Sequence, residues 1–113
     1  INILEKKYDK NMIWRKKVNN ELKNKYHKIF KLIDKLIFLK VPSFKHVFKW
    51  RLLQEKKLRI TSKSKKIMSY NQIKNFIMFY ERLTKHMLKN LSYKADSVIK
   101  IDKEHRLKSI KFN

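Results

Sequence analysis

The chain has 113 residues, of which 31 are lysine or arginine and 9 are acidic, and its formal net charge is +22. Hydrophobic residues make up 42% of it, so we expect a folded domain and not a disordered segment. The lack of cysteine excludes disulfides, thiolate metal sites and a cysteine nucleophile, and the lack of glycine excludes a Walker A loop or a dinucleotide fingerprint within these residues.

The positive charge has two interpretations. A strongly basic chain can bind a polyanion such as nucleic acid. However, only 5 of the basic residues are arginine, and lysine lacks the planar fork that favours arginine in phosphate and base recognition. The abundance of lysine, asparagine, isoleucine, phenylalanine and tyrosine is also typical of AT-rich coding sequences. We therefore do not expect nucleic acid as a partner. A lysine-rich helical protein that binds nucleic acid is kept as the alternative function.

No segment has the length of a membrane span. The longest apolar runs, Leu36–Leu39 and Phe76–Tyr80, are too short to cross a bilayer. The first residues contain no apolar stretch of the kind found in signal peptides. The sequence therefore predicts a cytoplasmic protein with no membrane partner.

One long helix is predicted in the first third of the chain. Residues 1–9 show no clear period, so we expect an irregular opening, and Asn11 is a candidate N-cap. From about residue 12 to 32, apolar residues recur every three or four positions, which predicts a helix with one buried stripe. The stripe comprises Ile13 or Trp14, Val18, Leu22, Tyr26, Ile29 or Phe30, and Ile33.

A strand, a turn and a second helix follow. The run Leu36–Leu39 has no polar alternation, which favours a strand covered on both faces, as in a parallel sheet. Pro42 ends it, and Ser43 caps a helix that we expect to end near Ile60. On this helix Val47, Arg51, Glu55 and Arg59 recur every four residues and so share one face. That face is either a row of salt bridges or a surface that handles anions.

A basic loop precedes the longest predicted helix. Residues 61–68 are polar and lysine-rich, which indicates an exposed loop or a lid, with the lid region spanning about residues 43–69. Ser69 and Gln72 form a capping box, which predicts a helix over about 70–91. Glu81 and Lys85 are placed as a favourable pair one turn apart on that helix.

The chain ends in two predicted strands. Ser97–Ile101 is the first, residues 102–105 form a polar turn, and Arg106–Phe112 alternates like an edge strand that returns antiparallel. Strands separated by helices predict an α/β fold with a largely parallel sheet. Three strands are too few for a complete domain of that kind, so we expect further strands N-terminal to this chain.

Several stretches, taken in order, resemble the C-terminal half of P-loop kinases of the D-glycerate 3-kinase type, within the uridine kinase and phosphoribulokinase-like group. They include LIFLKVPSF at 36–44, WRLLQEKKLR at 50–59, MSYNQIKNFI at 68–77, YERLTKHML at 80–88 and ADSVIKIDKEHRL at 95–107. The resemblance spans nearly all 113 residues. The family pattern has glycine immediately before Met-Ser, where this chain has Ile67.

The resemblance implies an ATP-dependent kinase that transfers the γ-phosphate to a hydroxyl of glycerate or a similar small substrate, with Mg²⁺. It implies the C-terminal part of a doubly wound, mostly parallel sheet with long helices and a terminal antiparallel strand. In such kinases the Walker A loop lies in the N-terminal half, which this chain lacks. The 113 residues are therefore expected to be inactive alone, and an inactive kinase remnant is a further alternative.

The resemblance also suggests site residues. Arg51 and Arg59 would be the phosphate-facing catalytic residues, with Glu55 orienting them, and the structural alternative is a ladder of salt bridges. Lys63 and Lys65 would contact ATP phosphates, although a solvated lysine run is the commoner case.

Three further positions complete the candidate site. Arg82 would bind the nucleotide or else pair with a nearby glutamate. Asp102 and His105 follow a predicted parallel strand, where ligands of doubly wound sheets bind, and would border the adenine. The histidines show no metal-ligand spacing, so no protein metal site is expected. The tryptophans sit at helical spacings and are expected in the core and not on a base-stacking surface.

Overall fold

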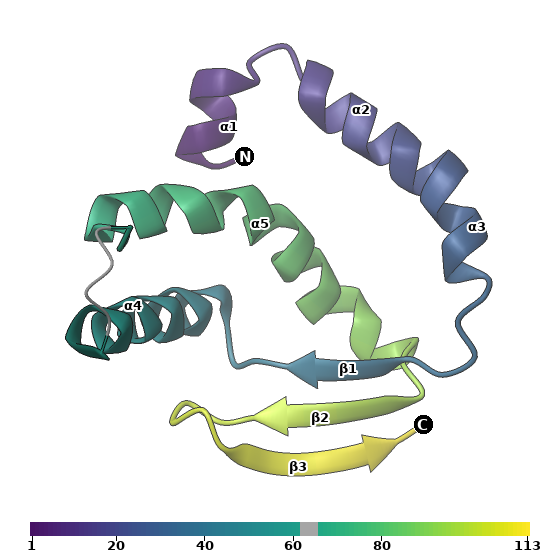
Figure 1. Ribbon diagram of the computed structural model, residues 1–113. Coiled ribbons are helices and arrows are strands. Elements are labelled where there is room, and N and C mark those ends of the chain that lie inside the picture. The colour runs from purple at the N-terminus through teal and green to yellow at the C-terminus, as the bar shows by residue number, and fades with distance from the viewer. Residues whose placement is uncertain (62–65) are drawn as a thin grey trace. The chain divides into compact units, whose positions relative to one another are not determined.

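The computed structural model describes residues 1–61 and 66–113, and the chain forms two compact units, Ile1–Leu36 and Ile37–Asn113. The first unit is helical, with α1 (Ile3–Tyr8), α2 (Ile13–Glu21), a π-helical turn (Leu22–Tyr26) and α3 (His27–Phe30). The second has the order β1, α4, α5, β2, β3 (Figure 1). The chain is thus an α/β protein with a small mixed sheet.

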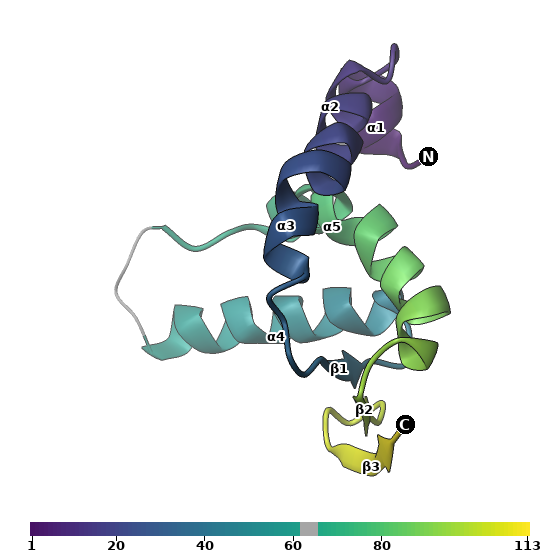
Figure 2. The same ribbon diagram turned by 90° about the vertical axis from the view of Figure 1, so that its right-hand side faces the viewer.

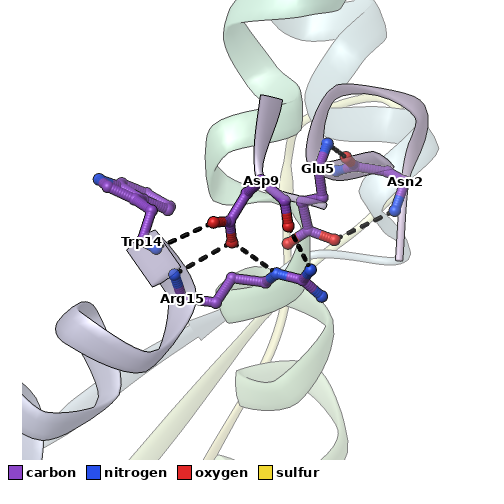
Figure 3. Close-up of polar contacts among 5 residues, drawn as sticks. All are labelled: Asn2, Glu5, Asp9, Trp14 and Arg15. Carbon is purple, nitrogen blue, oxygen red and sulfur yellow. Dashed lines mark hydrogen bonds and ion pairs between the residues drawn. The ribbon is translucent and has the colours of Figure 1, made fainter. Parts of the chain in front are cut away.

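Residues Ile3–Tyr8 form the helix α1, so the predicted irregular opening over residues 1–9 is wrong. The side chain of Asn2 accepts a hydrogen bond from the Glu5 backbone N–H at 2.9 Å, and the Glu5 carboxylate accepts one from the Asn2 N–H at 3.1 Å (Figure 3). This reciprocal capping box satisfies two N–H groups at the start of α1. The pattern is readable in the sequence, where a capping residue is followed three positions later by glutamate.

The predicted N-cap at Asn11 is also wrong. Met12 occupies the N-cap position of α2 with φ of 60°, a left-handed conformation, and its side chain caps nothing. The carboxylate of Asp9 takes over this function. It accepts the backbone N–H groups of Trp14 at 2.9 Å and Arg15 at 3.1 Å, which are the free donors at the start of α2 (Figure 3).

The predicted helix over 12–32 exists as the continuous helical segment from Ile13 to Phe30, including the π-helical turn. Its predicted burial is wrong. Ile13 and Ile29 are 71% and 57% exposed, Trp14 is 51% exposed, and only Val18 and Leu22 of the stripe are half-buried. The periodicity therefore identified the helix but not what covers it.

The strands of the second unit are β1 (Ile37–Lys40), β2 (Ser97–Ile101) and β3 (Leu107–Phe112), in the order β1-β2-β3. The β1–β2 pair is parallel and the β2–β3 pair is antiparallel, so the predicted antiparallel last strand is confirmed. The sheet is mixed and not largely parallel, because one of its two pairings is the terminal hairpin.

The helices α4 (Phe44–Thr61) and α5 (Tyr70–Asn90) confirm the predicted helices within one or two residues. The capping box of Ser69 and Gln72 is present at the start of α5, and Lys85 pairs with Glu81 at 2.7 Å. In Figure 1, α4 lies beyond the carboxyl end of β1, whereas α5 runs back toward the amino end of that strand. Figure 2 shows the same three strands nearly end-on, stacked edge to edge.

The apolar core lies in the second unit. Its buried residues are Phe38 of β1, Ile73 and Ile77 of α5, Ala95, and Val98 of β2. Phe38 and Val98 are register partners and so lie on the same sheet face. Ile37 and Leu39, on the opposite face, are 61% and 59% exposed, so the prediction that this strand is covered on both faces is wrong.

None of the helices in the described ranges combines the length and apolar character that crossing a bilayer requires.

Candidate functional site

The carboxyl ends of β1 and β2 lie together because the two strands are parallel. Lys40 of β1 is the register partner of Lys100 of β2, and both therefore project to the same side of the sheet. Just beyond them is a hollow of about 500 Å³, bordered by Val41 and Pro42 on one side and by the β2–β3 turn on the other. Its polar lining comprises Lys40, Lys100, Lys103, Lys108, Asp102 and Glu104.

Asp102 shapes the turn that borders this hollow. Its Oδ1 accepts backbone N–H groups from Glu104 at 3.0 Å and from Arg106 at 2.8 Å. Its backbone carbonyl accepts the N–H of His105 at 3.1 Å, and His105 adopts a left-handed conformation with φ of 62°. One oxygen of this carboxylate is thus committed to the fold of the turn.

His105 stacks on Trp50 of α4. The ring centroids are 4.2 Å apart and the planes are 12° from parallel. His46, one turn earlier on α4, lies 6.1 Å from the same indole, and its Nδ1 hydrogen-bonds the hydroxyl of Ser43 at 2.8 Å. Trp50 is half-buried, so the prediction that it lies in the core is wrong. Stacking joins α4 to the β2–β3 turn.

Arg51 is held by contacts within the protein. Its Nη2 pairs with Oε1 of Glu55 at 2.7 Å and lies 3.8 Å from the sulfur of Met68, and its Nη1 donates to Gln54 at 2.8 Å. Oε2 of the buried Glu55 accepts the Met68 N–H at 3.3 Å. The pair therefore connects α4 to the segment that precedes α5, which supports the structural alternative for Arg51.

The predicted ladder stops at Glu55. Arg59 is exposed on α4, and no ion-pair partner for it occurs among the residues that the structure describes. The two oxygens of Glu55 are engaged by Arg51 and Met68, and the i,i+4 spacing to Arg59 does not produce a second salt bridge.

The remaining candidates do not form one constellation. Arg82 is exposed on α5, whereas Asp102 and His105 lie together in the β2–β3 turn. Lys63 and Lys65 fall outside the described residues. Within the described ranges no three histidine, aspartate or glutamate side chains are grouped as metal ligands would be.

The first unit contains a separate cluster of charged groups. Arg15 Nε pairs with Asp9 Oδ2 at 2.7 Å, and Arg15 Nη2 donates to the Asp9 backbone carbonyl at 2.7 Å (Figure 3). Burial raises the pKa of the Asp9 carboxyl. The hydrogen bonds from the Arg15 side chain and from the backbone of Trp14 and Arg15, together with the Arg15 charge, outweigh this and hold the pKa below its usual value. Asp9 pairs with Arg15 and accepts the first backbone N–H groups of α2, so the cluster has a structural role and fixes the turn between α1 and α2.

No family model matches this chain, and comparison with curated proteins and with solved structures gives no match either.

Sequence reasoning missed the lysines that line the hollow and the stack of His105 on Trp50. A usable signal existed for the lysines, because Lys40, Lys100 and Lys103 lie at or just beyond the ends of the two predicted parallel strands. The stack joins residues 55 positions apart in the sequence, and no local pattern predicts such a pair.

Proposed function

We propose that the second unit supplies the anion-binding end of the sheet in an ATP-dependent small-molecule kinase of the D-glycerate 3-kinase type. The observation that carries the proposal is the hollow at the carboxyl ends of β1 and β2, with its four lysines. The resemblance of the sequence to that kinase group supplies the reaction class. The acceptor would be glycerate or another small molecule with a free hydroxyl.

The chemistry of the hollow favours an anionic ligand. Four ammonium groups in one lining repel one another, and only two carboxylates oppose them. Of those carboxylates, Asp102 is engaged with the turn backbone. A phosphate chain would relieve the repulsion, and its place beyond the carboxyl ends of parallel strands is where open α/β sheets bind ligands. Lys40, Lys100, Lys103 and Lys108 are the residues that would hold it.

The Trp50–His105 stack extends the same edge. In this proposal it borders the base of the nucleotide, with Asp102 fixing the turn and so the position of His105. Arg51 is a positioning residue in this arrangement, since its guanidinium fixes α4 through Glu55.

The described part of the chain has no group of three candidate metal ligands, so it offers no all-protein magnesium site. Mg²⁺ that accompanies a nucleotide usually takes one or two protein carboxylates together with phosphate oxygens and waters, and Asp102 and Glu104 are the carboxylates of this lining. A Walker A loop needs glycine, which this sequence lacks. We therefore assign no transfer step to these residues, and expect that the 113-residue chain does not phosphorylate glycerate unless a P-loop segment is supplied.

Calorimetric titration with ATP tests the proposal. We expect the double variant Lys40→Gln/Lys100→Gln to bind ATP about tenfold more weakly, which corresponds to about 1.4 kcal/mol. The matched control is Lys49→Gln/Lys56→Gln, which removes the same charge from exposed positions on α4. Equal losses in both variants, or no ATP binding by the unmodified chain at millimolar concentration, would refute the proposal.

A further inference from the structure

The apolar side chains of the first unit are largely exposed. Those exposed by 45% or more are Ile1, Ile3, Tyr8, Met12, Ile13, Trp14, Tyr26, Ile29, Phe30, Leu32 and Ile33. The buried side chains of the same unit are Glu5, Asp9 and Arg15, all of them charged. This unit of 36 residues thus buries an ion pair and leaves most of its hydrophobic residues exposed, with Leu4, Val18, Leu22 and Leu36 half-buried.

This arrangement is the reverse of what water favours. Each apolar side chain that leaves water is worth about 1.5–3 kcal/mol, and none of the eleven is buried in this structure. We take this set of exposed apolar side chains as a candidate interaction surface. It includes Trp14 and Tyr26, whose rings combine an apolar body with a polar group, and these residue types are enriched where membranes meet water.

Positive charge accompanies the apolar surface. The first unit has eleven basic residues and four acidic ones. Of the acidic residues, Asp9 is paired with Arg15 and Glu21 with Lys25. Lys16, Lys17, Lys23 and Lys28 are exposed on the same helical segment as Trp14 and Ile29. Lysine-rich helices with aromatic and aliphatic residues on another face are typical of segments that lie on anionic bilayers.

We infer that the unit Ile1–Leu36 binds the surface of an anionic lipid bilayer, with its apolar side chains in the headgroup–acyl boundary and its lysines against the lipid phosphates and carboxylates. It would lie on the membrane and not cross it, consistent with the described helices being too short or too polar to span. This differs from the sequence-based expectation of no membrane partner, which was based on the lack of a spanning apolar run and of a signal-peptide stretch.

Other occupants satisfy only part of this surface. A second copy of the chain would bring another +22 of like charge against the lysines. A polynucleotide offers phosphates, but its bases stack on aromatic rings and provide no phase for Ile3, Ile13, Ile29, Leu32 and Ile33. A protein groove takes one narrow stripe of a helix, whereas these residues come from α1, α2, α3 and the segments beside them. A bilayer supplies both charge and a deformable apolar phase.

Tryptophan fluorescence of the full chain is the first test. Trp50→Phe leaves Trp14 as the only indole, and Trp14→Phe leaves Trp50. We expect vesicles of phosphatidylcholine with about one-third phosphatidylserine to shift Trp14 emission to shorter wavelength, and to shift Trp50 much less. Pure phosphatidylcholine vesicles should give a weaker response, and raised salt should reduce binding. The absence of a Trp14 shift with anionic vesicles would overturn the inference.

Vesicle sedimentation separates the apolar and the charged contributions. Ile29→Ser/Phe30→Ser should weaken binding at least about tenfold, whereas the matched pair Ile60→Ser/Tyr93→Ser, on exposed residues of the second unit, should not. Lys16→Gln/Lys17→Gln should weaken it about fivefold for each lysine, in contrast to Lys49→Gln/Lys56→Gln. Equal effects of test and control pairs would indicate non-specific charge attraction and overturn the inference. So would a mixed-sequence polynucleotide that competes with the vesicles and shifts Trp14 to the same wavelength.

Discussion

The two units of this chain bury opposite kinds of side chain. In Ile37–Asn113, the residues removed from water are mostly apolar, from Phe38 through Ile73 and Ile77 to Val98, with Glu55 as the buried charged side chain in its described part. In Ile1–Leu36 they are charged, and the apolar residues are exposed. Both sequences carry helical apolar periodicity. The difference shows that periodicity reports which side chains share a face, while burial depends on whether another element covers that face.

The cause lies in the range of the contacts. The second unit contains a parallel strand pair whose partners are 60 residues apart, such as Phe38 and Val98, and it also packs α4 against α5. In the first unit, the hydrogen bond of Asn2 with Glu5 and the ion pair of Asp9 with Arg15 are local contacts. Local polar contacts fix helix ends well, but they bury little apolar surface.

The largest effect should come from Ile73, which is 1% exposed in the core of the second unit. Ile73→Ala leaves a cavity and should lower the free energy of unfolding by about 2–5 kcal/mol. Ile29→Ala in the first unit removes the same atoms from an exposed site and should change it by less than about 0.5 kcal/mol in the absence of membranes. Urea titration followed by circular dichroism measures both. Similar losses of stability in the two variants would mean that Ile29 is buried in solution, which would contradict the contrast drawn between the two units.

The second effect is a pH dependence confined to the first unit. Because the pKa of Asp9 is lower in the folded state, its carboxylate stabilises this unit fully above the ordinary value of 3.8, and that stabilisation is lost as the pH falls through the folded pKa. The protection of the amides of residues 13–21 against hydrogen exchange, relative to their intrinsic exchange rates, should therefore fall below about pH 4. Asp9→Asn should show fast exchange already at neutral pH.

Asp34→Asn is the matched control for this experiment, since it removes an exposed carboxylate from the same unit. It should leave the exchange of residues 13–21 unchanged. If Asp9→Asn also left it unchanged, the capping of α2 by Asp9 would be refuted.

The smallest effect concerns Met12 and His105, the two residues with positive φ among residues 1–61 and 66–113. Left-handed backbone costs a residue other than glycine about 1–2 kcal/mol, so Met12→Gly should stabilise the first unit by up to about 1 kcal/mol after the added chain entropy of glycine. His105→Gly should bring no gain, because it also removes the stack on Trp50, worth about 0.5–1.5 kcal/mol. Thermal unfolding measures both, and a gain in the second variant would mean that the stack is not stabilising.

Much of the local structure followed from short sequence patterns. The capping box of Ser69 and Gln72 predicted the start of α5, and Pro42 with Ser43 predicted the break between β1 and α4. The same logic applied to Asn2 and Glu5 would have found α1. It could not have found Asp9 as the cap of α2, because the carboxylate precedes the first free N–H group by five residues.

The candidate site was predictable only in part. The turn at Asp102–His105 was placed correctly at the end of a parallel strand, since strand order and polarity put it there. Arg51 was placed correctly beside Glu55, but its further contacts with Gln54 and Met68 depend on how the segment before α5 returns to α4. The spacing of charges along one helix face does not tell whether those charges bind a ligand or hold a neighbouring segment in place.

The sequence by itself determined the secondary structure of the second unit, the parallel-then-antiparallel strand pattern, and the absence of a glycine-dependent phosphate loop. These depend on backbone preferences and on residue types, which act over a few positions. Only the tertiary structure decided that Lys40 and Lys100 share a hollow, that His105 lies on Trp50, and that the apolar residues of the first unit face outward. Those outcomes depend on which surfaces meet, and surfaces are made by residues far apart in the chain.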